Sequence, residues 1–291
     1  MKVPHCQPGV WPDDIPESRF ASTIRREAPD GCRIALLGLP DELGVRLNGG
    51  RPGAGEGPTA LRAALSRYGA AQASGIRWPG VFDAGDIQPG ADLDETHDRV
   101  SVAVESLLAA DLFPIGIGGG HDLTYAFVRP VATRLSGMVG LYFDAHLDVR
   151  AEKGSGMPFR RLVEDCSVRS LYVQGLDPFA NSEEHVTWFQ GHGGHIDSLD
   201  LADPLPEGDL FVSLDLDVID QAFAPGVSAM NPNGWTPALA EAWVRAAARC
   251  PRVRCFDMME LSPPHDAQGR TARLAARLLL AFLESFTERS Q

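Results

Sequence analysis

Short apolar runs with the character of β-strands alternate with helical patterns along this chain. Strands that are hydrophobic throughout and separated by helices favour a parallel sheet covered by helices on both faces. The sequence therefore predicts an α/β fold of three layers, α/β/α, with a mostly parallel central sheet. The predicted strands are Arg33–Leu39, Leu112–Ile117, Val139–Asp144, Val168–Val173, Leu210–Asp215 and Val253–Met258, and the predicted helices are Pro58–Tyr68, Glu95–Ala109, Leu123–Leu135, Pro237–Arg249 and Arg270–Glu284.

Length and composition bound the domain organisation. With 291 residues, 44% of them apolar, the chain can bury a sizeable core as two average domains or as one large α/β unit. The sequence has no internal repeat, no low-complexity tract and no break in composition. We therefore expect a single domain over 31–291, preceded by an irregular segment over 1–30.

Charge and cysteine content exclude several classes of function. A net charge of −13 argues against binding to nucleic acid, whose phosphates need a basic surface. The five cysteines are odd in number and scattered, without a C-x-x-C pair, which is typical of reduced thiols in a cytoplasmic protein. The N-terminal stretch lacks the apolar region of a signal peptide, and no apolar stretch approaches the length of a membrane span.

Two carboxylates and an imidazole follow the apolar run at 139–143, as Asp144, His146 and Asp148. Buried charge is very costly unless it is paired, neutralised or bound to metal. In an extended segment these three side chains share one face, because side chains alternate along a strand. Three oxygen and nitrogen ligands would then converge on one point, which predicts a metal site.

Further polar clusters follow three other predicted strands, at the strand ends where open α/β sheets bind ligands. Gly118–Gly120 precede His121, which we expect to open a helix, and the glycines permit close backbone approach. Such a turn can cradle phosphate, but neither nucleotide-binding glycine motif is present. Asp215 and Asp217 again alternate after a strand. Glu260 follows the last strand, where a lone Glu is more often a surface residue.

The first three clusters together offer two histidines and four aspartates: His121, Asp144, His146, Asp148, Asp215 and Asp217. Carboxylate oxygen with some imidazole suits Mn²⁺ or Mg²⁺ better than Zn²⁺ with thiolate. Six ligands are too many for one ordinary catalytic ion, but they fit two ions that share bridging carboxylates. Because such a pair can hold a hydroxide formed at neutral pH, the pattern predicts a hydrolase.

Three motifs together resemble the ureohydrolase superfamily, which includes arginase, agmatinase, guanidinobutyrase and formimidoylglutamase. They are G-G-G-H-D at 118–122, D-A-H-L-D at 144–148 and S-L-D-L-D-V-I-D at 213–220. The resemblance spans 33–285 and implies an arginase-like catalytic domain with two Mn²⁺ that hydrolyses a guanidine or formimine carbon. It also implies a homo-oligomer, since relatives often form trimers or hexamers.

The resemblance also implies a role for each matching residue. One ion would be held by His121, Asp144, Asp148 and Asp215, and the other by Asp144, His146, Asp215 and Asp217. Asp144 and Asp215 would bridge the two ions, with a hydroxide between them. His121, Asp148 and Glu260 would be catalytic: Asp148 would accept and pass on a proton, and Glu260 would orient the cationic amidine or guanidine group of the substrate.

Departures from the arginase pattern indicate the substrate. Arginases and agmatinases usually carry a shuttle His in an H-G-M-P stretch, where this chain has Ser155. The stretch at 154–159, together with Arg150 and the segments 45–54 and 224–229, is instead similar to formimidoylglutamase. Its substrate carries two carboxylates, for which Arg is the usual bidentate partner. The candidate substrate contacts are therefore Ser155, Arg46, Arg51 and Arg150, although each arginine could equally form a surface or structural ion pair.

The expected reaction is Mn²⁺-dependent hydrolysis of N-formimino-L-glutamate to L-glutamate and formamide, within histidine degradation. Two alternatives stay open: a ureohydrolase acting on guanidinobutyrate, agmatine or arginine, and a metal-binding paralogue with a structural or regulatory role and no turnover. We expect His192, His195 and His265 in solvated loops outside the site. Phe159 and Trp235 either line the pocket or only pack.

Overall fold

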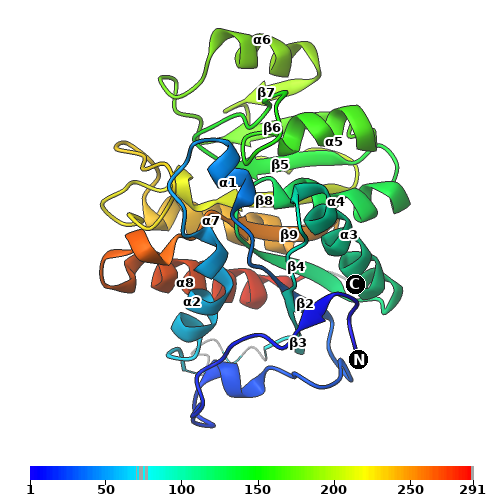
Figure 1. The fold of residues 1–291 in the computed structure, drawn as a ribbon, viewed down its shortest axis with the longest axis vertical. Coiled ribbons are helices and arrows are strands. Elements are labelled where there is room, and N and C mark those ends of the chain that lie inside the picture. The colour runs from blue at the N-terminus through cyan, green and yellow to red at the C-terminus, as the bar shows by residue number, and fades with distance from the viewer. Residues whose placement is uncertain (70, 72–74, 76–77, 290–291) are drawn as a thin grey trace.

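The computed structural model describes residues 1–69, 71, 75 and 78–289, and shows one sheet between two layers of helices (Figure 1). In this described part the sheet has the strand order β1-β3-β2-β4-β9-β8-β5-β6-β7. Neighbouring strands are parallel except for β1 and β3. The α/β class with a mostly parallel sheet is therefore confirmed. The strands are β1 (Cys6–Gln7), β2 (Ile34–Leu39), β3 (Val81–Ile87), β4 (Phe113–Gly118), β5 (Val139–Phe143), β6 (Ser170–Gln174), β7 (Gly194–Ile196), β8 (Leu210–Asp215) and β9 (Val253–Met259).

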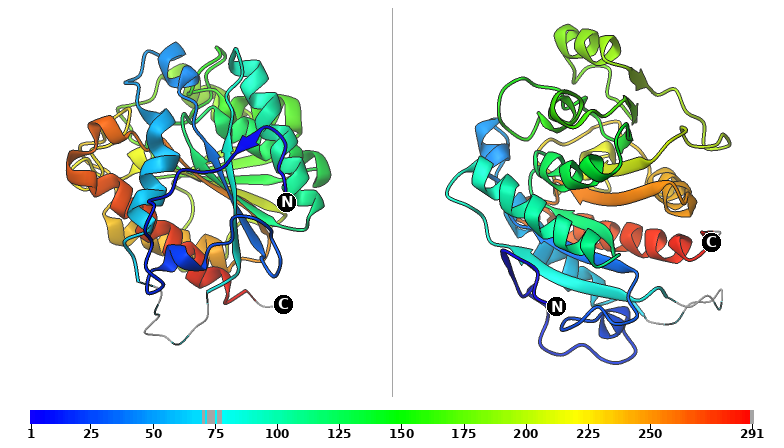
Figure 2. Two further views of the ribbon diagram at one scale, coloured as in Figure 1. Left: turned by 60° about the horizontal axis from the view of Figure 1, so that its bottom comes forward. Right: turned by 90° about the vertical axis from the view of Figure 1, so that its right-hand side faces the viewer.

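Helices cover both faces of the sheet and bury two separate cores. α2, α7 and α8 pack on one face, and α3, α4 and α5 pack on the other (Figure 2). In β2, Ile34 and Leu36 enter the first core, whereas Leu37 and Leu39 enter the second. A strand buried on both faces is apolar at every position, which is why these strands are recognisable in the sequence. The helices are α1 (Leu43–Leu47), α2 (Gly57–Leu65), α3 (Leu93–Ala109), α4 (Leu123–Arg134), α5 (Pro158–Cys166), α6 (Glu183–Gly191), α7 (Pro237–Arg249) and α8 (Arg270–Phe286), with single 3₁₀ turns η1 (Phe20–Thr23), η2 (Ala54–Glu56), η3 (Leu216–Val218), η4 (Pro263–His265) and η5 (Ala267–Gly269).

Every predicted strand and helix is present, with ends shifted by a few residues, while β1, β3, β7, α1, α5 and α6 were not predicted.

The expectation of a loop at His195 was wrong, because this residue lies in β7, within a Gly-rich stretch. The His195 ring stacks on Tyr172 at 4.3 Å. His192 is the C-cap of α6 and stacks on Trp188 at 4.2 Å. His265 lies in η4 and is half-buried, with Nε2 3.0 Å from Pro52 O. Residues 1–30 contain only β1 and η1, and the division into this segment and one domain over 31–291 stays a prediction.

β3 was missed because two carboxylates interrupt its apolar sequence. Asp83 and Asp86 are nonetheless buried, and the fully buried guanidinium of Arg62 in α2 neutralises both. Arg62 Nε and Nη2 each lie 2.9 Å from an oxygen of Asp83, and Nη1 lies 2.5 Å from Asp86 Oδ1. Trp11 adds a hydrogen bond from Nε1 to Asp83 Oδ2 at 2.5 Å. This network joins α2, β3 and the N-terminal segment.

In the described part of the chain, no helix combines the length and apolar composition needed to cross a membrane.

Replacing Arg62 by methionine should destabilise the fold, because it leaves two buried carboxylates without a counter-charge. We expect the free energy of unfolding to fall by about 3–5 kcal/mol. Arg46→Met is the matched control: Arg46 pairs with Glu42 at the surface, and its loss should cost less than about 1 kcal/mol. Urea denaturation followed by circular dichroism measures both changes. Equal effects of the two substitutions would contradict the role assigned to Arg62.

Candidate metal centre and active site

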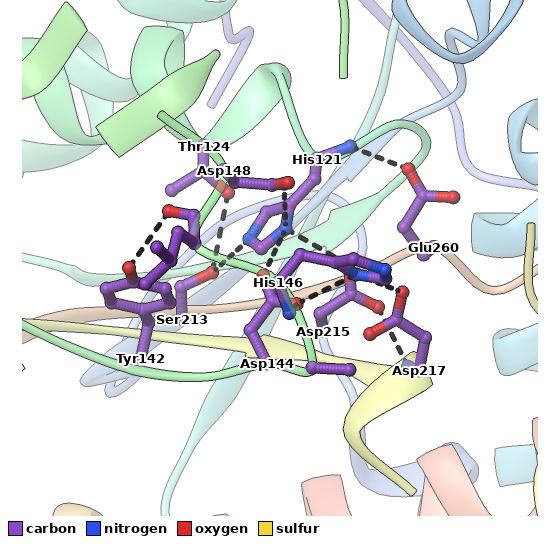
Figure 3. Close-up of polar contacts among 12 residues, drawn as sticks. His121, Thr124, Tyr142, Asp144, His146, Asp148, Ser213, Asp215, Asp217 and Glu260 are labelled. Carbon is purple, nitrogen blue, oxygen red and sulfur yellow. Dashed lines mark hydrogen bonds and ion pairs between the residues drawn. The ribbon is translucent and has the colours of Figure 1, made fainter. Parts of the chain in front are cut away.

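Four neighbouring strands end at one edge of the sheet and carry the predicted ligands on the loops that follow. β4, β9, β8 and β5 are adjacent in this order and parallel, so their carboxyl ends meet. His121 follows β4, Glu260 follows β9, Asp215 and Asp217 lie at the end of β8, and the segment 144–148 follows β5. Their side chains point toward one another (Figure 3).

The first group of side chains surrounds His121. Its Nδ1 lies 3.2 Å from Asp144 Oδ2, 3.0 Å from Asp148 Oδ2 and 3.0 Å from Asp215 Oδ2. The four side chains offer ligand atoms within 4.8 Å of one another. All are buried except Asp148, whose side chain is 15% exposed. The structure thus brings together the complete set predicted for one ion.

The second group centres on His146. Its Nδ1 lies 3.4 Å from Asp144 Oδ1 and 3.1 Å from Asp217 Oδ2. Asp144 belongs to both groups and faces each with a different oxygen, as a bridging carboxylate would. Asp215 joins only the first group, through its Oδ2, while its Oδ1 accepts a hydrogen bond from the backbone N–H of Asp217 at 2.8 Å. Bridging by Asp215 stays a prediction.

We expected the ligands to converge because side chains alternate along an extended segment. This expectation was wrong. β5 ends at Phe143, and Asp144 Oδ1 accepts a hydrogen bond from the N–H of His146 at 2.6 Å, which turns the chain. Asp148 has a φ of 48° in the left-handed region, and Asp217 lies in the 3₁₀ turn η3. His121 does not open a helix either, since α4 begins at Leu123. Local side-chain hydrogen bonds, rather than strand geometry, aim these ligands.

A residue that the sequence did not single out, Asn181, fixes the loop between Asp144 and Asp148. Its Oδ1 accepts a hydrogen bond from Leu147 N–H at 2.9 Å, and its Nδ2 donates to Ala145 O at 3.0 Å and to Asp177 O at 2.9 Å. The hydroxyl of Tyr142 donates to Leu147 O at 2.9 Å. The loop is therefore held from both sides. An Asn in a turn is too common for its type alone to reveal such a role.

Aromatic residues support the ligands from behind. Phe159 is buried with its ring edge-on to the imidazole of His121 at 5.2 Å and stacked on Tyr142 at 3.6 Å. Trp235 packs against Phe143 and the Trp243 ring. Neither Phe159 nor Trp235 lines the cavity described below.

The glycines before His121 serve close backbone packing. A Cβ on Gly119 would lie 2.1 Å from Asp41 O and 2.5 Å from Leu39 O, so only glycine fits there. This packing carries the chain from β4 directly into the site.

The six groups perturb one another strongly. Burial raises the pKa of Asp144 and of Asp215, and neighbouring carboxylates raise both pKa values further. Burial alone would lower the pKa of His121, but the surrounding carboxylates raise it well above its usual value. Asp217 raises the pKa of His146 in the same way. Without a cation, the cluster retains protons that its groups would lose in water at neutral pH.

These side chains fit divalent cations. The buried Asp217 Oδ1 makes no hydrogen bond, and His121 Nδ1 and Asp144 Oδ2 approach other atoms of the cluster without hydrogen-bond geometry, although buried polar atoms almost always have a partner. Ligand atoms of this kind, carboxylate oxygen and imidazole nitrogen, suit Mn²⁺. No Lys or Arg in the described residues pairs with the four aspartates. Cations from solution would supply both the missing partners and the missing charge.

A cavity of about 300 Å³ opens onto these ligands. Glu260 lines it and is buried, with Oε1 accepting a hydrogen bond from His121 N–H at 3.0 Å and Oε2 left without a partner. Burial raises the pKa of Glu260 to about 8. Ser155, Arg51 and Arg150 also line the cavity. Asn48 and Ser228, from the segments 45–54 and 224–229, line it too, as do Asn181 and His185, which the sequence did not single out.

The three candidate arginines differ in their surroundings. Arg150 makes no side-chain hydrogen bond or ion pair within the described residues, so its guanidinium is free. Arg51 donates through Nε to Ser228 O at 3.0 Å and through Nη2 to Val227 O at 2.5 Å, which gives it a structural role as well. Arg46 does not line the cavity, because it lies on the exposed side of α1 and pairs with Glu42.

Comparison with known proteins places this arrangement in a family. Residues 32–284 match the family model described as "Arginase family". The chain belongs to the arginase family. The curated relatives of this family member include the formimidoylglutamase of Aromatoleum aromaticum, at 38% identity over 87% of this chain and 82% of the relative, and that of Halobacterium salinarum, at 35% identity over 87% and 88%.

Solved structures of similar proteins share the fold of this chain. A Trypanosoma cruzi formiminoglutamase with two Mn²⁺ superposes with a TM-score of 0.86 at 28% identity, over 95% of this chain and all of that one. The proclavaminate amidino hydrolase of Streptomyces clavuligerus superposes with a TM-score of 0.82 at 26% identity, over 94% of this chain and 98% of that one.

The raised pKa values predict how the stability of the metal-free protein depends on pH. Carboxyl and imidazole groups with raised pKa values bind more protons in the folded chain than in the unfolded chain. Their stabilising contribution is complete at low pH and is lost as the pH rises through the folded pKa values. We expect the Tm of chelator-treated protein to fall from about pH 5 to about pH 8, the window set by ordinary carboxyl groups and by Glu260.

Mn²⁺ should raise the Tm more at the upper end of this range than at the lower end, because bound cations replace the retained protons. Differential scanning calorimetry with and without Mn²⁺ measures both trends. A metal-free protein whose Tm rises steadily over this pH range would contradict the electrostatic description of the cluster.

Proposed function

We propose that this protein hydrolyses N-formimino-L-glutamate to L-glutamate and formamide, the reaction of a formimidoylglutamase in histidine degradation. One cavity holds a free guanidinium, that of Arg150, and an unpartnered carboxylate oxygen, that of Glu260. This pairing carries the proposal, because the substrate combines two carboxylates with a formimino group that is cationic when protonated. The curated formimidoylglutamases of similar sequence support it.

Two Mn²⁺ would be held at the base of the cavity, one by His121, Asp144, Asp148 and Asp215 and the other by Asp144, His146, Asp215 and Asp217. When bound, such a pair of ions lowers the pKa of water so that hydroxide is available at neutral pH. Water hydrolyses the bond between the formimino carbon and the glutamate nitrogen, and its oxygen becomes the carbonyl oxygen of formamide.

Glu260 would orient the formimino group. Its Oε2 is buried, unpartnered and part of the cavity wall, so an N–H of the protonated formimino group would satisfy it. A cationic substrate would also lower the raised pKa of this carboxyl group and favour its ionised form.

Asp148 would transfer the proton. Its side chain is the most exposed of the four aspartates and lines the cavity beside His121. A carboxylate there can take a proton from water and deliver it to the glutamate nitrogen as the carbon–nitrogen bond breaks. Ser155, also in the wall, stands where arginases usually carry a histidine, so this chain would work without that shuttle.

Arg150 would bind a carboxylate of the glutamate part, with help from Arg51. The neighbouring Ser155 hydroxyl is a further donor in the same wall. We also propose that the enzyme acts in the cytoplasm as a homo-oligomer on this small molecule, without nucleic acid. Five free cysteines and a net charge of −13 support a reducing compartment and a partner that is not a polyanion.

Assays with a panel of substrates test the proposed function. Purified protein loaded with Mn²⁺ should release glutamate and formamide from formiminoglutamate much faster than it releases urea from arginine, agmatine or guanidinobutyrate. Urea as the main product would favour a guanidino substrate, a possibility raised by the similar fold of the proclavaminate enzyme. Bound Mn²⁺ without turnover on any substrate would favour a non-catalytic role.

Arg150→Gln should weaken substrate binding selectively, because it removes a charged donor to a carboxylate. Such hydrogen bonds contribute about 1.5–3 kcal/mol, so we expect KM to rise roughly 10- to 150-fold while kcat changes little. Arg277→Gln is the matched control, since Arg277 pairs with Glu241 on the exposed side of α8. Steady-state kinetics on formiminoglutamate measures both variants. An unchanged KM in Arg150→Gln would remove Arg150 from the substrate site.

A further inference from the structure

We propose that Ser213 and Asp257 are positioning residues for one of the two metal ions, acting through the imidazole of His121. This inference rests on the proposed two-metal centre. It adds a chain of hydrogen bonds behind one ligand and predicts that the two ions are held unequally.

The chain of hydrogen bonds has a defined direction. Ser213 Oγ lies 2.5 Å from Asp257 Oδ1 and 3.0 Å from His121 Nε2. An ionised carboxylate can only accept, so the Ser213 hydroxyl donates to Asp257 and its oxygen accepts from Nε2–H. With a cation bound, the imidazole would thereby be fixed in the tautomer that carries its proton on Nε2 and its lone pair on Nδ1. Nδ1 is the nitrogen that faces Asp144, Asp148 and Asp215.

The sheet imposes this geometry. Ser213 in β8 and Asp257 in β9 are direct partners in the parallel pairing of the two strands. Both are fully buried, and Thr124 Oγ1 lies 3.5 Å from Ser213 Oγ on the other side. The relative position of the two side chains therefore does not depend on a loop.

The buried carboxylate of Asp257 is only partly stabilised by its neighbours: burial raises its pKa to about 6, although the His121 imidazole and the hydroxyls of Ser213 and Thr124 lower it. No Lys or Arg in the described residues forms an ion pair with it, and its Oδ2 makes no hydrogen bond. An uncompensated buried charge is costly. A cation held on the far side of His121, linked through Ser213, would compensate this charge and make its burial tolerable.

The two histidines differ in this respect. His121 is fully buried and anchored through Nε2, whereas the His146 side chain is 30% exposed and has no hydrogen bond to Nε2 within the described residues. Groups that hydrogen-bond to a metal-bound histidine fix its orientation and raise its basicity, and their loss typically weakens metal affinity about 10- to 100-fold. Ser213 and Asp257 would thus strengthen only the ion that His121 binds.

Titration of metal-free protein with Mn²⁺, by calorimetry and by electron paramagnetic resonance, tests this inference without substrate. The wild type should bind two ions with unequal affinity. In Ser213→Ala and in Asp257→Asn, one of the two ions should bind about 10- to 100-fold more weakly while the other keeps its affinity. The double variant should bind this ion only slightly more weakly than the single variant with the lower affinity, because both residues act through the same imidazole.

Ser285→Ala is the matched control, since it also removes one fully buried hydroxyl, but in α8; its Mn²⁺ binding should equal that of the wild type. Asp257→Asn keeps the shape of the side chain, so it tests the chain of hydrogen bonds even if Ser213→Ala does not fold. Equal weakening of both ions, additive effects in the double variant, or unchanged affinity would overturn the inference. A wild type that binds two unequal ions and responds as described, but does not hydrolyse formiminoglutamate, would refute the proposed substrate and leave this inference intact.

Discussion

The parallel pairing of β4, β9, β8 and β5 is the constraint on which the site depends. Hydrogen bonds between these strands align their carboxyl ends within one or two residues. Four loops from distant parts of the chain therefore start at the same edge. The ends of β4, β8 and β5 supply one, two and three of the six ligands respectively, and the end of β9 supplies Glu260.

The protein handles buried carboxylates in two contrasting ways. In β3, Asp83 and Asp86 are neutralised inside the chain by the guanidinium of Arg62. At the carboxyl edge, four aspartates face one another with two imidazoles and no Lys or Arg among the described residues. The first arrangement is self-sufficient and structural. The second is electrostatically incomplete, and this incompleteness makes it a binding site for cations.

The fold was predictable where burial on both faces leaves an uninterrupted apolar run, as in β5 and β8. It was not predictable where tertiary contacts overrule the local pattern: Arg62 allows two aspartates in β3, and the ring of Tyr172 helps to order His195 in β7. The six candidate ligands could be named because their residue types and spacing are unusual. The way in which these ligands come together could not be predicted, because it depends on turns within each loop and on hydrogen bonds from residues such as Asn181.

The hydrogen bonds of Asn181 have a consequence for how substrate preference can change in this family. One side chain belongs to the cavity wall and also fastens the loop that carries His146 and Asp148. Remodelling that wall for a new substrate would disturb catalytic power at the same time. Within the described residues, the side chains of Arg51, Arg150 and Ser155 line the cavity but make no hydrogen bond to this loop. Substrate specificity can therefore change most easily in those segments, where this chain departs most clearly from the arginase pattern.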